Sequence, residues 1–508
     1  MTDELNNALP GAPAGAARTG GAAGLGAPAG AGAVASHAAF AGPPDRLRVA
    51  VVGGGAAGTL AAVHLLRAAQ RPVEVTLIDA DGSFGPGIAY GTEDPLHLLN
   101  VPACRMGGLA GQPDHFHAWL RGRGLDVGPE EFVARGLYGE YLRDLLDEAE
   151  RGAGRGVSLR RQVGEVVGIE DPGPAAGPLS VRLADGGALE ADRAVLAIGA
   201  LPGDDPFPVA EELRERGAYV GDPWAPGALS GIGAEETVLV VGTGLTMVDV
   251  VLTLSAGEGG PTIRAVSRHG LVPRRHRPEL TRVQSFPLPL EEGRLEPLVA
   301  AVVEQIGRVS LQGGDWRDVF DSVRSLTPAA WRALRAEDKR RFVSTLQRFW
   351  EVHRFRMAPA VADRFDELVA SGRVRVDAGA VVAVEPRPRG ARVSVRAVGR
   401  RDPELIDVDR IVNCSGAGAD VERHATPLVR QLLRSGRARP DELRLGLDVD
   451  PDGGLVDVAG RASERIRVVG QLRRGVEWEA IGITEIREHA AAAAAAALAG
   501  AERPRRAA

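Results

Sequence analysis

The feature that most constrains the fold is a strand, glycine turn and helix pattern that begins at Leu47. The letters LRVAVV are mostly apolar and β-branched, GGGAAG supplies the turn, and TLAAVHLLRAA has the apolar spacing of a helix. A second apolar run, VEVTLIDAD, contains Asp79 near its end. This order predicts a β-α-β unit.

Three glycines give the turn the spacing G-x-G-x-x-G, at Gly53, Gly55 and Gly58. In a dinucleotide-binding unit these glycines allow a tight turn, the approach of backbone to a pyrophosphate and close helix packing. The helix N-terminus faces the phosphates, and an acid about 20 residues later, here Asp79, binds ribose hydroxyls. A purely structural glycine turn is the alternative, but the strand, helix and acid in this order favour a dinucleotide site.

A second unit of the same kind occupies residues 237–270, with TVLVVGTGLTMVDVVLTLSA followed by TIRAVSRHG. Its turn has Gly242 and Gly244, but Met247 stands where a third glycine or alanine is usual. The helix still begins with two glycines that allow close backbone approach. We expect the second dinucleotide to contact Gly242, Gly244, Leu245 and Thr246.

The second strand of this unit ends in Ser267 and Arg268 instead of an acid. A cation at that position suits a ribose 2′-phosphate, which favours NADPH over NADH. The alternative is that Arg268 is an ordinary solvated arginine of the surface.

A longer repeat follows each unit. In both copies a helix-like stretch precedes strand-like segments that end at a glycine, and the spans 164–199 and 379–416 are similar in length. An accidental match of this length is improbable. The expected fold class is α/β, with two doubly wound, Rossmann-like dinucleotide-binding domains, the second inserted into the first.

The helix-rich stretch between Glu291 and Pro359 has no counterpart in the first unit, so we expect it to cover a site that the second domain does not make alone. An Ala-, Gly- and Pro-rich start predicts a disordered tail, because it cannot bury enough surface to offset chain entropy. The expected divisions are a tail at 1–44, an FAD domain at 45–235 and 401–508, and an NADPH domain at 236–400 with a helical insertion at 285–360.

Composition narrows the function classes. A formal charge of −6 over 508 residues implies no general field for nucleic acid or membrane. Cys104 and Cys414 form no C-x-x-C pair, which argues against a disulfide framework, a zinc site and a dithiol centre. No apolar run reaches the roughly 20 residues of a membrane span, and the acidic MTDELNN start is unlike a secretion signal. We expect a cytoplasmic protein with no membrane or nucleic-acid partner, and a homo-oligomer stays compatible with the sequence.

Two nucleotide sites, one with an acid and one with a basic strand end, suggest FAD held permanently and NADPH visiting. The flavin would then carry the redox chemistry while the protein positions and shields it. The lack of an evident triad or metal cluster in the sequence therefore does not argue against an enzyme.

The segment HLLNVPACRMGG carries a resemblance to flavin-containing monooxygenases that use NADPH and form a C4a-(hydro)peroxyflavin. Its Asn100, Pro102 and Met106 match the pattern N-x-P-x-x-x-M of that family. The resemblance implies that Asn100 lies beside FAD and NADP and stabilises the oxygenated flavin, which makes it the candidate catalytic residue. Further FAD contacts are expected from His97, Val101, Met106 and Gln471, the last in QLRRGVEWEA near the flavin pyrimidine edge.

A closer resemblance covers the chain from Val49 to His489. The stretches GPGIAYGTEDPLHLLNVPA, GDPW, LVPRRHRP, WEVHRFRMAP, DRIVNCSGAGAD and VVGQLRRGVEWEAIGITEIREHA look like a bacterial FAD/NAD(P)-binding family. That family is similar to the aspartate N-monooxygenases of nitrous-acid-forming pathways, which oxidise the amine of aspartate to nitrosuccinate. The resemblance implies L-aspartate as the first substrate to consider.

Two basic clusters bear on the substrate. RRHR, at residues 274–277, follows the expected NADPH strand, and HRFR, at 353–356, closes the helical stretch. If they meet over the flavin, their guanidinium groups suit an acidic amino acid. The alternative, weighed evenly, is that they bind NADPH phosphates or lie solvated on the surface. The candidate substrate-binding residues are Arg274, Arg275, His276 and Arg354.

The segment HLLNVPACRMGG also contains a cysteine and a histidine, but the sequence does not favour a catalytic Cys/His site there. A catalytic thiolate at Cys104 would need a base and a depressed pKa, and a flavin-side loop with His97 supplies neither by itself. Cys414, inside DRIVNCSG, has the context of a small core residue.

Three functions follow, in order of preference. The first is an FAD- and NADPH-dependent monooxygenase that uses O2 to hydroxylate nitrogen on a small amine or acidic amino acid. The second is an NAD(P)H-dependent flavin reductase or dehydrogenase that passes electrons to a quinone or protein acceptor. The third is a non-catalytic flavoprotein that senses redox state, for which the degenerate turn at Met247 would be natural.

Overall fold

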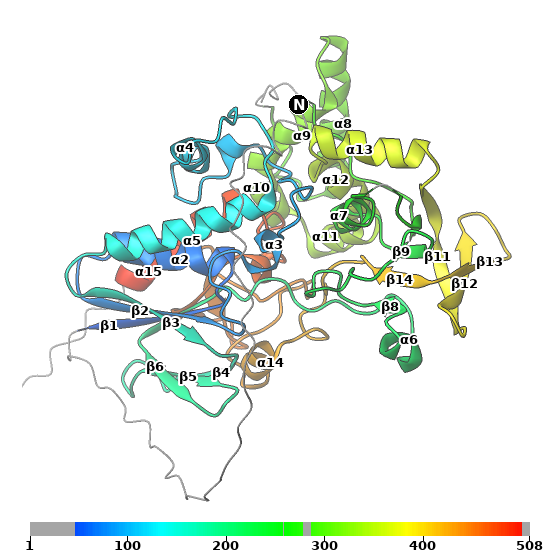
Figure 1. Cartoon of the computed structure of the whole chain (residues 1–508). Coiled ribbons are helices and arrows are strands. Elements are labelled where there is room, and N and C mark those ends of the chain that lie inside the picture. The colour runs from blue at the N-terminus through cyan, green and yellow to red at the C-terminus, as the bar shows by residue number, and fades with distance from the viewer. Residues whose placement is uncertain (1–45, 258, 278–285, 500–508) are drawn as a thin grey trace, which may run out of the picture. The chain divides into compact units, whose positions relative to one another are not determined.

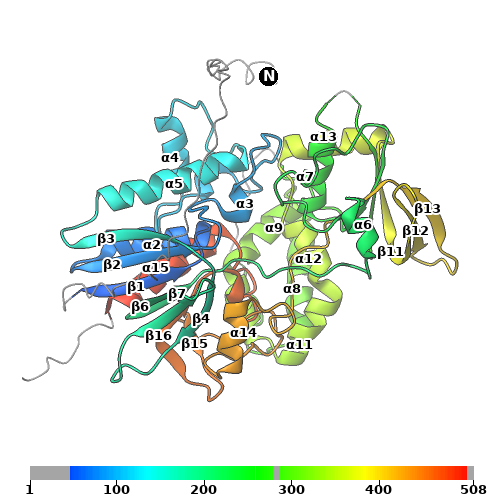
Figure 2. The same ribbon diagram turned by 60° about the horizontal axis from the view of Figure 1, so that its bottom comes forward.

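The computed structural model describes residues 46–257, 259–277 and 286–499. The expected tail at 1–44 lies outside these residues. Within them the chain forms two large sheets, a smaller sheet and a set of helices between residues 295 and 354 (Figures 1 and 2).

The first large sheet has the order β15-β16-β7-β1-β2-β3. All neighbours in it are parallel except the edge pair β15 and β16. Its strands are β1 (Leu47–Val52), β2 (Val73–Asp79), β3 (Val157–Val163), β7 (Arg193–Leu196), β15 (Gly454–Val456) and β16 (Ala462–Val468). The sheet therefore combines strands from both ends of the described chain, as the inserted-domain prediction requires.

Alternate residues of β1 point to opposite faces of this sheet, so both faces carry a core. Val49 and Val51 pack with helices α2 (Ala56–Ala68), α5 (Arg135–Arg151) and α15 (Ile483–Ala499). Ala50 and Val52 pack with the small antiparallel sheet and α14 (Pro427–Arg434). The small sheet contains β4 (Val166–Glu170), β5 (Leu179–Leu183) and β6 (Ala188–Ala191).

The second large sheet has the order β13-β12-β11-β10-β9-β14-β8. Its parallel part is β8 (Tyr219–Val220), β9 (Thr237–Val241), β10 (Thr262–Ser267), β14 (Arg410–Asn413) and the start of β11 (Val374–Pro386). The end of β11 continues into an antiparallel meander with β12 (Ala391–Ala397) and β13 (Glu404–Val408). Helices α7 (Leu245–Leu254) and α13 (Pro359–Ala370) pack on one face, and α6 (Glu211–Glu215) lies close to β8.

The two domains repeat the same topology, as the internal sequence repeat predicts. In each, the first β-α-β unit is flanked by a strand that leads into an antiparallel meander and by the strand that returns from it. The structure corrects the expected boundaries, however. Strands β13 and β14 belong to the second sheet, although the expected boundary at residue 400 assigns them to the first domain, and β8 belongs there although it precedes residue 236. Their pairing partners are distant in sequence, so local pattern does not reveal the boundary.

The expected insertion is helical. It contains α8 (Leu295–Leu311), α9 (Trp316–Val323), α10 (Thr327–Ala333), α11 (Ala336–Arg341), a π-helical turn (Phe342–Leu346) and α12 (Gln347–Arg354). Trp331 packs against Trp478 of the first domain, with ring centroids 4.8 Å apart, and donates its indole N–H to the carbonyl of Gly475 at 2.8 Å. The insertion is therefore anchored on the first domain while its ends belong to the second.

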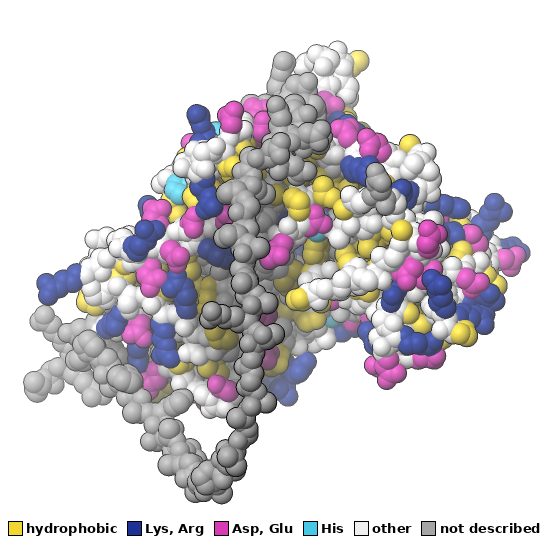
Figure 3. All heavy atoms as spheres, viewed as in Figure 1, with side chains coloured by type: hydrophobic (Ala, Val, Ile, Leu, Met, Phe, Trp, Pro, Cys, Tyr) yellow, Lys and Arg dark blue, Asp and Glu magenta, His cyan; other side chains and the backbone are white. Residues whose placement is uncertain are grey.

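The remaining short elements are α3 (Gly87–Tyr90), α4 (His115–Gly122) and three 3-10 turns (Ala103–Arg105, Arg324–Leu326 and Gln471–Arg473). Within the described residues no helix combines the length and apolar character needed to cross a membrane. Figure 3 shows basic and acidic side chains interspersed over the described part of the face in view.

Candidate cofactor and substrate site

The first glycine turn has the geometry of a nucleotide cradle. Gly53 has a φ of +105°, and a Cβ at Gly58 would lie 1.8 Å from the Gly53 carbonyl oxygen, so neither position accepts a side chain. Gly55 is the N-cap of α2, and no side chain caps that helix. Its first-turn amide groups are therefore available to an anion such as a pyrophosphate.

Asp79 lies at the carboxyl end of β2 beside this turn. Its carboxylate accepts the backbone N–H of Gly54 at 2.9 Å, and those of Asp81 and Ser83 at 3.1 Å each. A carboxylate has about four acceptor positions, so capacity is left for a ribose hydroxyl. Asp79 thus also fixes the turn itself.

The second glycine turn leaves open space at its helix. Gly242 has a φ of +110°, and a Cβ there would lie 2.1 Å from the Cys414 carbonyl oxygen. Gly244 caps α7 without a side-chain hydrogen bond, and no atom of the residues that the structure describes lies within 4 Å of its Cβ position. Met247 is fully buried in the core beneath the helix. The missing third glycine therefore affects packing and not the face that a phosphate would approach.

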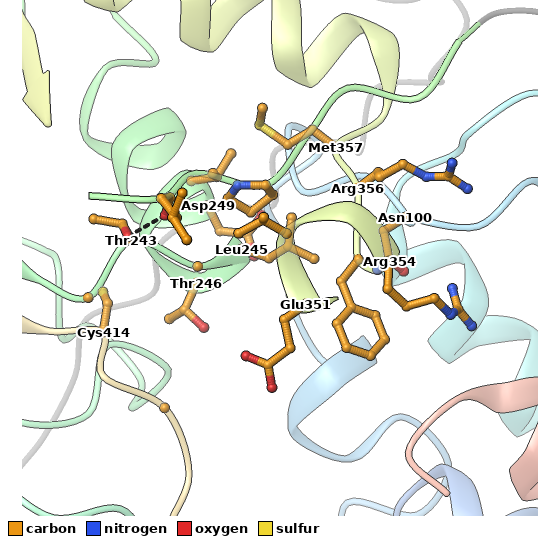
Figure 4. Close-up of a pocket in the computed structure, with 18 of the residues that line it drawn as sticks. Asn100, Thr243, Leu245, Thr246, Asp249, Glu351, Arg354, Arg356, Met357 and Cys414 are labelled. Carbon is orange, nitrogen blue, oxygen red and sulfur yellow. Dashed lines mark hydrogen bonds between the residues drawn. The ribbon is translucent and has the colours of Figure 1, made fainter. Parts of the chain in front are cut away.

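A cavity of about 870 Å³ lies against this turn and joins both domains (Figure 4). The second domain contributes the turn, the end of β10 and the start of β11. The first domain contributes the Asn100 loop and the residues before α15. Of the predicted contacts, the lining includes Asn100, Val101, Met106, Gly242, Gly244, Leu245, Thr246, Ser267, Arg268 and Arg354.

Ser267 and Arg268 stand at the edge of the cavity beside the turn. Ser267 Oγ lies 2.7 Å from Thr243 Oγ1 and accepts the backbone N–H of Gly270 at 3.1 Å, which holds the strand end in place. The Arg268 side chain is exposed and, within the described residues, forms no ion pair. Its guanidinium is therefore free to meet a phosphate.

Asn100 is held from the second domain. His276 Nε2 lies 3.0 Å from the Asn100 carbonyl oxygen, and Asn100 itself lines the cavity. Val101 and Met106 line the cavity from the same loop. The loop predicted to lie at the flavin thus faces the second nucleotide turn across the cavity.

Two predicted FAD contacts, His97 and Gln471, lie outside this cavity. His97 is buried and is bonded through both ring nitrogens, at Nδ1 to Thr92 Oγ1 (2.7 Å) and at Nε2 to Thr253 Oγ1 (2.9 Å). It joins its loop to α7 and is not part of the lining, so it has a structural role. Gln471 follows β16, next to Gly470, whose Cβ position lies 3.5 Å from Ala57 of the first helical turn. Gln471 therefore stands beside the first nucleotide turn and outside this cavity.

The two basic clusters do meet, but only part of each faces the cavity. Arg275 turns outward and pairs with Asp363 at 2.6 Å and Asp366 at 3.0 Å on α13, and the Arg274 side chain is exposed. Neither lines the cavity, which corrects their expected role as substrate ligands. His276 contacts the Asn100 backbone instead. Spacing along the chain does not show the direction of a side chain, which is why the clusters looked equivalent.

Arg354 and Arg356 of the second cluster are buried and line the cavity. Arg354 Nη2 lies 2.9 Å from Glu479 Oε2, with Nε at 3.2 Å from Oε1. Arg356 pairs with Asp321, and burial lowers the pKa of Arg356. Among the described residues, its Nε and Nη1 atoms have no hydrogen-bond partner. These arginines are therefore cations held in place beside Asn100 (Figure 4).

Further charged groups line the cavity near Arg354 and Arg356, and the sequence analysis did not predict them. Arg474 pairs with Glu351 at 3.1 Å, and Arg324 pairs with Glu485 at 2.9 Å, with both arginines in the lining. Arg348 also lines the cavity and bonds Glu351 at 2.7 Å. Within the described ranges, five arginines therefore line this part of the cavity and pair with four carboxylates, so the lining favours a negatively charged ligand.

Neither cysteine is activated. Burial raises the pKa of Cys104, and it also raises the pKa of Cys414, whose thiol is buried in the second core. Both are free thiols. The structure therefore supports the interpretation that Cys104 is not a catalytic thiolate and that Cys414 is a core residue.

Residues 50–201 match the sequence model of a family described as FAD-NAD(P)-binding. The matched segment contains the first glycine turn, Asp79 and Asn100. It confirms the predicted cofactor class for the first domain. A relative, the L-aspartate N-monooxygenase (nitrosuccinate-forming) of Streptomyces davaonensis, is 28% identical over 268 residues, which are 46% of this chain and 41% of that protein. The alignment therefore spans less than half of the relative.

Solved structures resemble nearly the whole described chain. An ornithine N-hydroxylase of Kutzneria sp. 744, solved with reduced FAD, NADP+ and L-ornithine, has a TM-score of 0.54 at 17% identity and covers 88% of this chain and 98% of its own. The bacillithiol disulfide reductase of Staphylococcus aureus has a TM-score of 0.51 at 11% identity and covers 89% and 98%. At these identities the likeness shows the two-domain fold and not the reaction.

Proposed function

We propose that this protein is an FAD- and NADPH-dependent monooxygenase that hydroxylates the amine of a small acidic amino acid, with L-aspartate as the first substrate to test. One observation carries the proposal: Asn100, the second nucleotide turn and the buried arginines Arg354 and Arg356 line one cavity. A relative that acts on L-aspartate supports the choice of substrate.

FAD fits the first turn, because the side-chain-free glycines and the uncapped α2 provide a pyrophosphate cradle. NADPH fits the second turn, where the space beside Gly244 is open and Arg268 is unpaired among the described residues. Bound FAD, once reduced by NADPH, supplies the oxygen-transfer chemistry. The protein's own residues bind, orient and shield the reacting groups.

Asn100 provides the polar group at the reacting centre. It lines the cavity together with the apolar residues Leu98, Val101 and Met106. An amide both donates and accepts hydrogen bonds, so it can orient a neutral amine without protonating it. Arg354 and Arg356 are the proposed carboxylate ligands, and because the paired Arg354 is already oriented it can bind a carboxylate with little loss of rotamer entropy.

The arginines also provide the selectivity. A dicarboxylate amino acid brings two negative charges to a lining with an excess of guanidinium groups. An amino acid with a cationic side chain would instead place its ammonium against them, and like charges in a partly buried site repel strongly. We therefore infer a preference for acidic over basic amino acids.

A reductase is the second candidate, because the same fold occurs in a disulfide reductase. A redox sensor remains the third. The buried position of Met247 removes the main reason for the third, since the nucleotide face of the turn is open. The asparagine and arginine groups in the cavity favour the first, since neither alternative requires them. A reducing, cytoplasmic compartment is part of the proposal and agrees with the two free thiols.

One experiment separates the three. The purified flavoprotein is reduced with NADPH without oxygen, oxygen is then admitted, and the flavin absorbance and the products are followed with a panel of acidic and basic amino acids. A monooxygenase gives a delayed return of oxidised flavin and an N-hydroxylated product from the acidic members. If O2 reoxidises the flavin at once and hydrogen peroxide is the only product, the protein is a reductase. If NADPH does not reduce the flavin, the protein is a sensor.

A further inference from the structure

The loop that carries His276 is fixed to the segment that carries the cavity arginines. Arg274 N–H donates to the Val352 carbonyl at 2.8 Å, Met357 N–H donates to the Arg274 carbonyl at 2.8 Å, and His276 N–H donates to the Met357 carbonyl at 2.9 Å. These three bonds place the His276 backbone in register with residues 352–357. The histidine therefore cannot move independently of Arg354 and Arg356.

Among the described residues, the ring of His276 bonds to Asn100 across the domain boundary. A carbonyl oxygen only accepts, so Nε2 donates its hydrogen to the Asn100 carbonyl at 3.0 Å. The ring also packs on Phe132, with centroids 4.9 Å apart. Burial and the positive charge of Arg356 lower the pKa of His276 to about 3, so the ring remains neutral and Nε2 keeps its single proton near neutral pH.

From these contacts we propose that His276 is a positioning residue: it fixes the Asn100 peptide, and thereby the Asn100 amide, in register with the buried arginines that bind the substrate carboxylates. This inference rests on the proposed function. It gives His276 a role different from the substrate contact that the sequence suggested. Because the bond links two domains, it also couples the geometry at the flavin loop to the geometry of the substrate arginines.

The physical basis is the limited freedom of a peptide plane. With the carbonyl of Asn100 bonded, the plane between residues 100 and 101 has one orientation, and the side chain starts from a fixed backbone. Without the bond, the peptide can rotate toward other acceptors or donors. A displacement of about 1 Å at a reacting group is enough to reduce a rate strongly.

The test compares His276→Gln with His276→Leu. Glutamine places its amide nitrogen close to the position of Nε2 and keeps the donor, whereas leucine removes it. His117→Leu is the matched control, because His117 Nε2 makes the same kind of bond, to the Val127 carbonyl at 2.9 Å, outside the cavity lining. Each variant is assayed for product formed per NADPH consumed, for the Michaelis constants and for FAD content, and a crystal structure of each locates Asn100.

We expect His276→Leu to lower product per NADPH severalfold and to shift the Asn100 peptide in the crystal structure, while the Michaelis constant for NADPH stays unchanged. His276→Gln restores coupling, and His117→Leu leaves it at the wild-type value. Equal coupling in His276→Leu and wild type, or equal losses in all three variants, overturns the inference.

Failure of the proposed function is distinguishable from failure of this inference. Asn100→Ala, assayed in parallel, lowers coupling if Asn100 acts as proposed. If Asn100→Ala lowers coupling and His276→Leu does not, the positioning role is wrong and the proposed function stands. If wild type forms no N-hydroxylated product, the proposed function fails, and an unmoved Asn100 in the His276→Leu crystal structure then also overturns the positioning role.

Discussion

Arg135 and Asp249 form an ion pair across the two domains, with Arg135 Nη2 2.8 Å from Asp249 Oδ2. Arg135 begins α5 of the first domain and Asp249 lies on α7 of the second, and both line the cavity. The guanidinium also lies over the Trp224 ring, 5.3 Å from its centroid. Burial raises the pKa of Asp249, whereas the charge of Arg135 lowers it. The ion pair therefore stabilises a carboxylate at a site where burial disfavours its charged form.

Breaking this pair should destabilise the protein. Asp249→Leu leaves the Arg135 guanidinium without its partner, and we expect a loss of roughly 3 kcal/mol in the free energy of unfolding. Urea denaturation of the FAD-loaded protein measures it. The double variant Arg135→Met with Asp249→Leu should recover much of the loss, because both charges are then removed.

The control is Arg161 on the surface, which forms ion pairs with Asp147 and with Glu150, each at 2.6 Å. Arg161→Met should cost less than about 1 kcal/mol. Similar losses from Asp249→Leu and Arg161→Met would show that the interdomain pair is no stronger than a solvated one.

Arg268 should select the nucleotide. Arg268→Ala removes the one guanidinium expected at the 2′-phosphate, so kcat/KM for NADPH should fall about 10- to 100-fold while that for NADH stays nearly constant. Steady-state NADPH and NADH oxidation under air measures the ratio. Equal falls in kcat/KM for NADPH and NADH would show that Arg268 does not bind the 2′-phosphate.

Arg354 and Arg275 should behave differently although both belong to basic clusters in the sequence. Arg354→Lys keeps the charge opposite Glu479 but loses the planar fork, so the Michaelis constant for L-aspartate should rise about tenfold and that for NADPH should not change. Arg275→Lys should change neither, because Arg275 is paired on the surface with Asp363 and Asp366. A rise from Arg275→Lys, or a rise for NADPH alone from Arg354→Lys, would contradict the assignment.

Glu477 should contribute to the loss of folding stability at acid pH. Burial favours its neutral form, but the hydrogen bond from His489 and the charge of Arg473 outweigh this and lower the pKa of Glu477 from 4.5 to about 2. The unfolded chain therefore binds this proton at a higher pH than the folded protein does. The stabilisation is complete above the unfolded pKa and is lost as pH falls toward the folded one.

Between pH 5 and pH 3 this group should account for a loss of roughly 2 kcal/mol in the free energy of unfolding. Glu477→Gln does not titrate, so its stability should fall less over the same interval. Urea denaturation at pH 5, 4 and 3 compares the two proteins. Parallel losses in both would show that Glu477 is not the source.

Much of the fold could be predicted because its signals are local. Each β-α-β unit has its apolar strands, glycines and helix within about 30 residues of chain, which is the length of the unit itself. The boundary after Asn413 could not be predicted from composition, since β14 pairs with β9, 172 residues earlier, and with β8, 192 residues earlier. The internal repeat contained that information, because its second copy ends at Gly416 and not at residue 400.

The site was predictable where backbone defines it and less so where side-chain direction does. Gly242, Gly244 and Asn100 were found by spacing and resemblance. Arg275 and Arg354 could not be told apart, because exposure depends on which elements pack beside them. Asp249 had an unused signal: it is the one charged residue in the apolar helix LTMVDVVLTL, and a buried carboxylate requires a partner. The partner, 114 residues away, was not encoded locally.

The origin of the oxygen atom on the product nitrogen tests the proposed N-hydroxylation most directly. The FAD-loaded protein is supplied with NADPH, L-aspartate and 18O2, and the products are analysed by mass spectrometry. The proposed monooxygenase forms an N-oxidised aspartate product that carries 18O on nitrogen, in proportion to the NADPH consumed. NADPH consumption that yields only labelled hydrogen peroxide and unchanged aspartate would contradict the proposed N-hydroxylation.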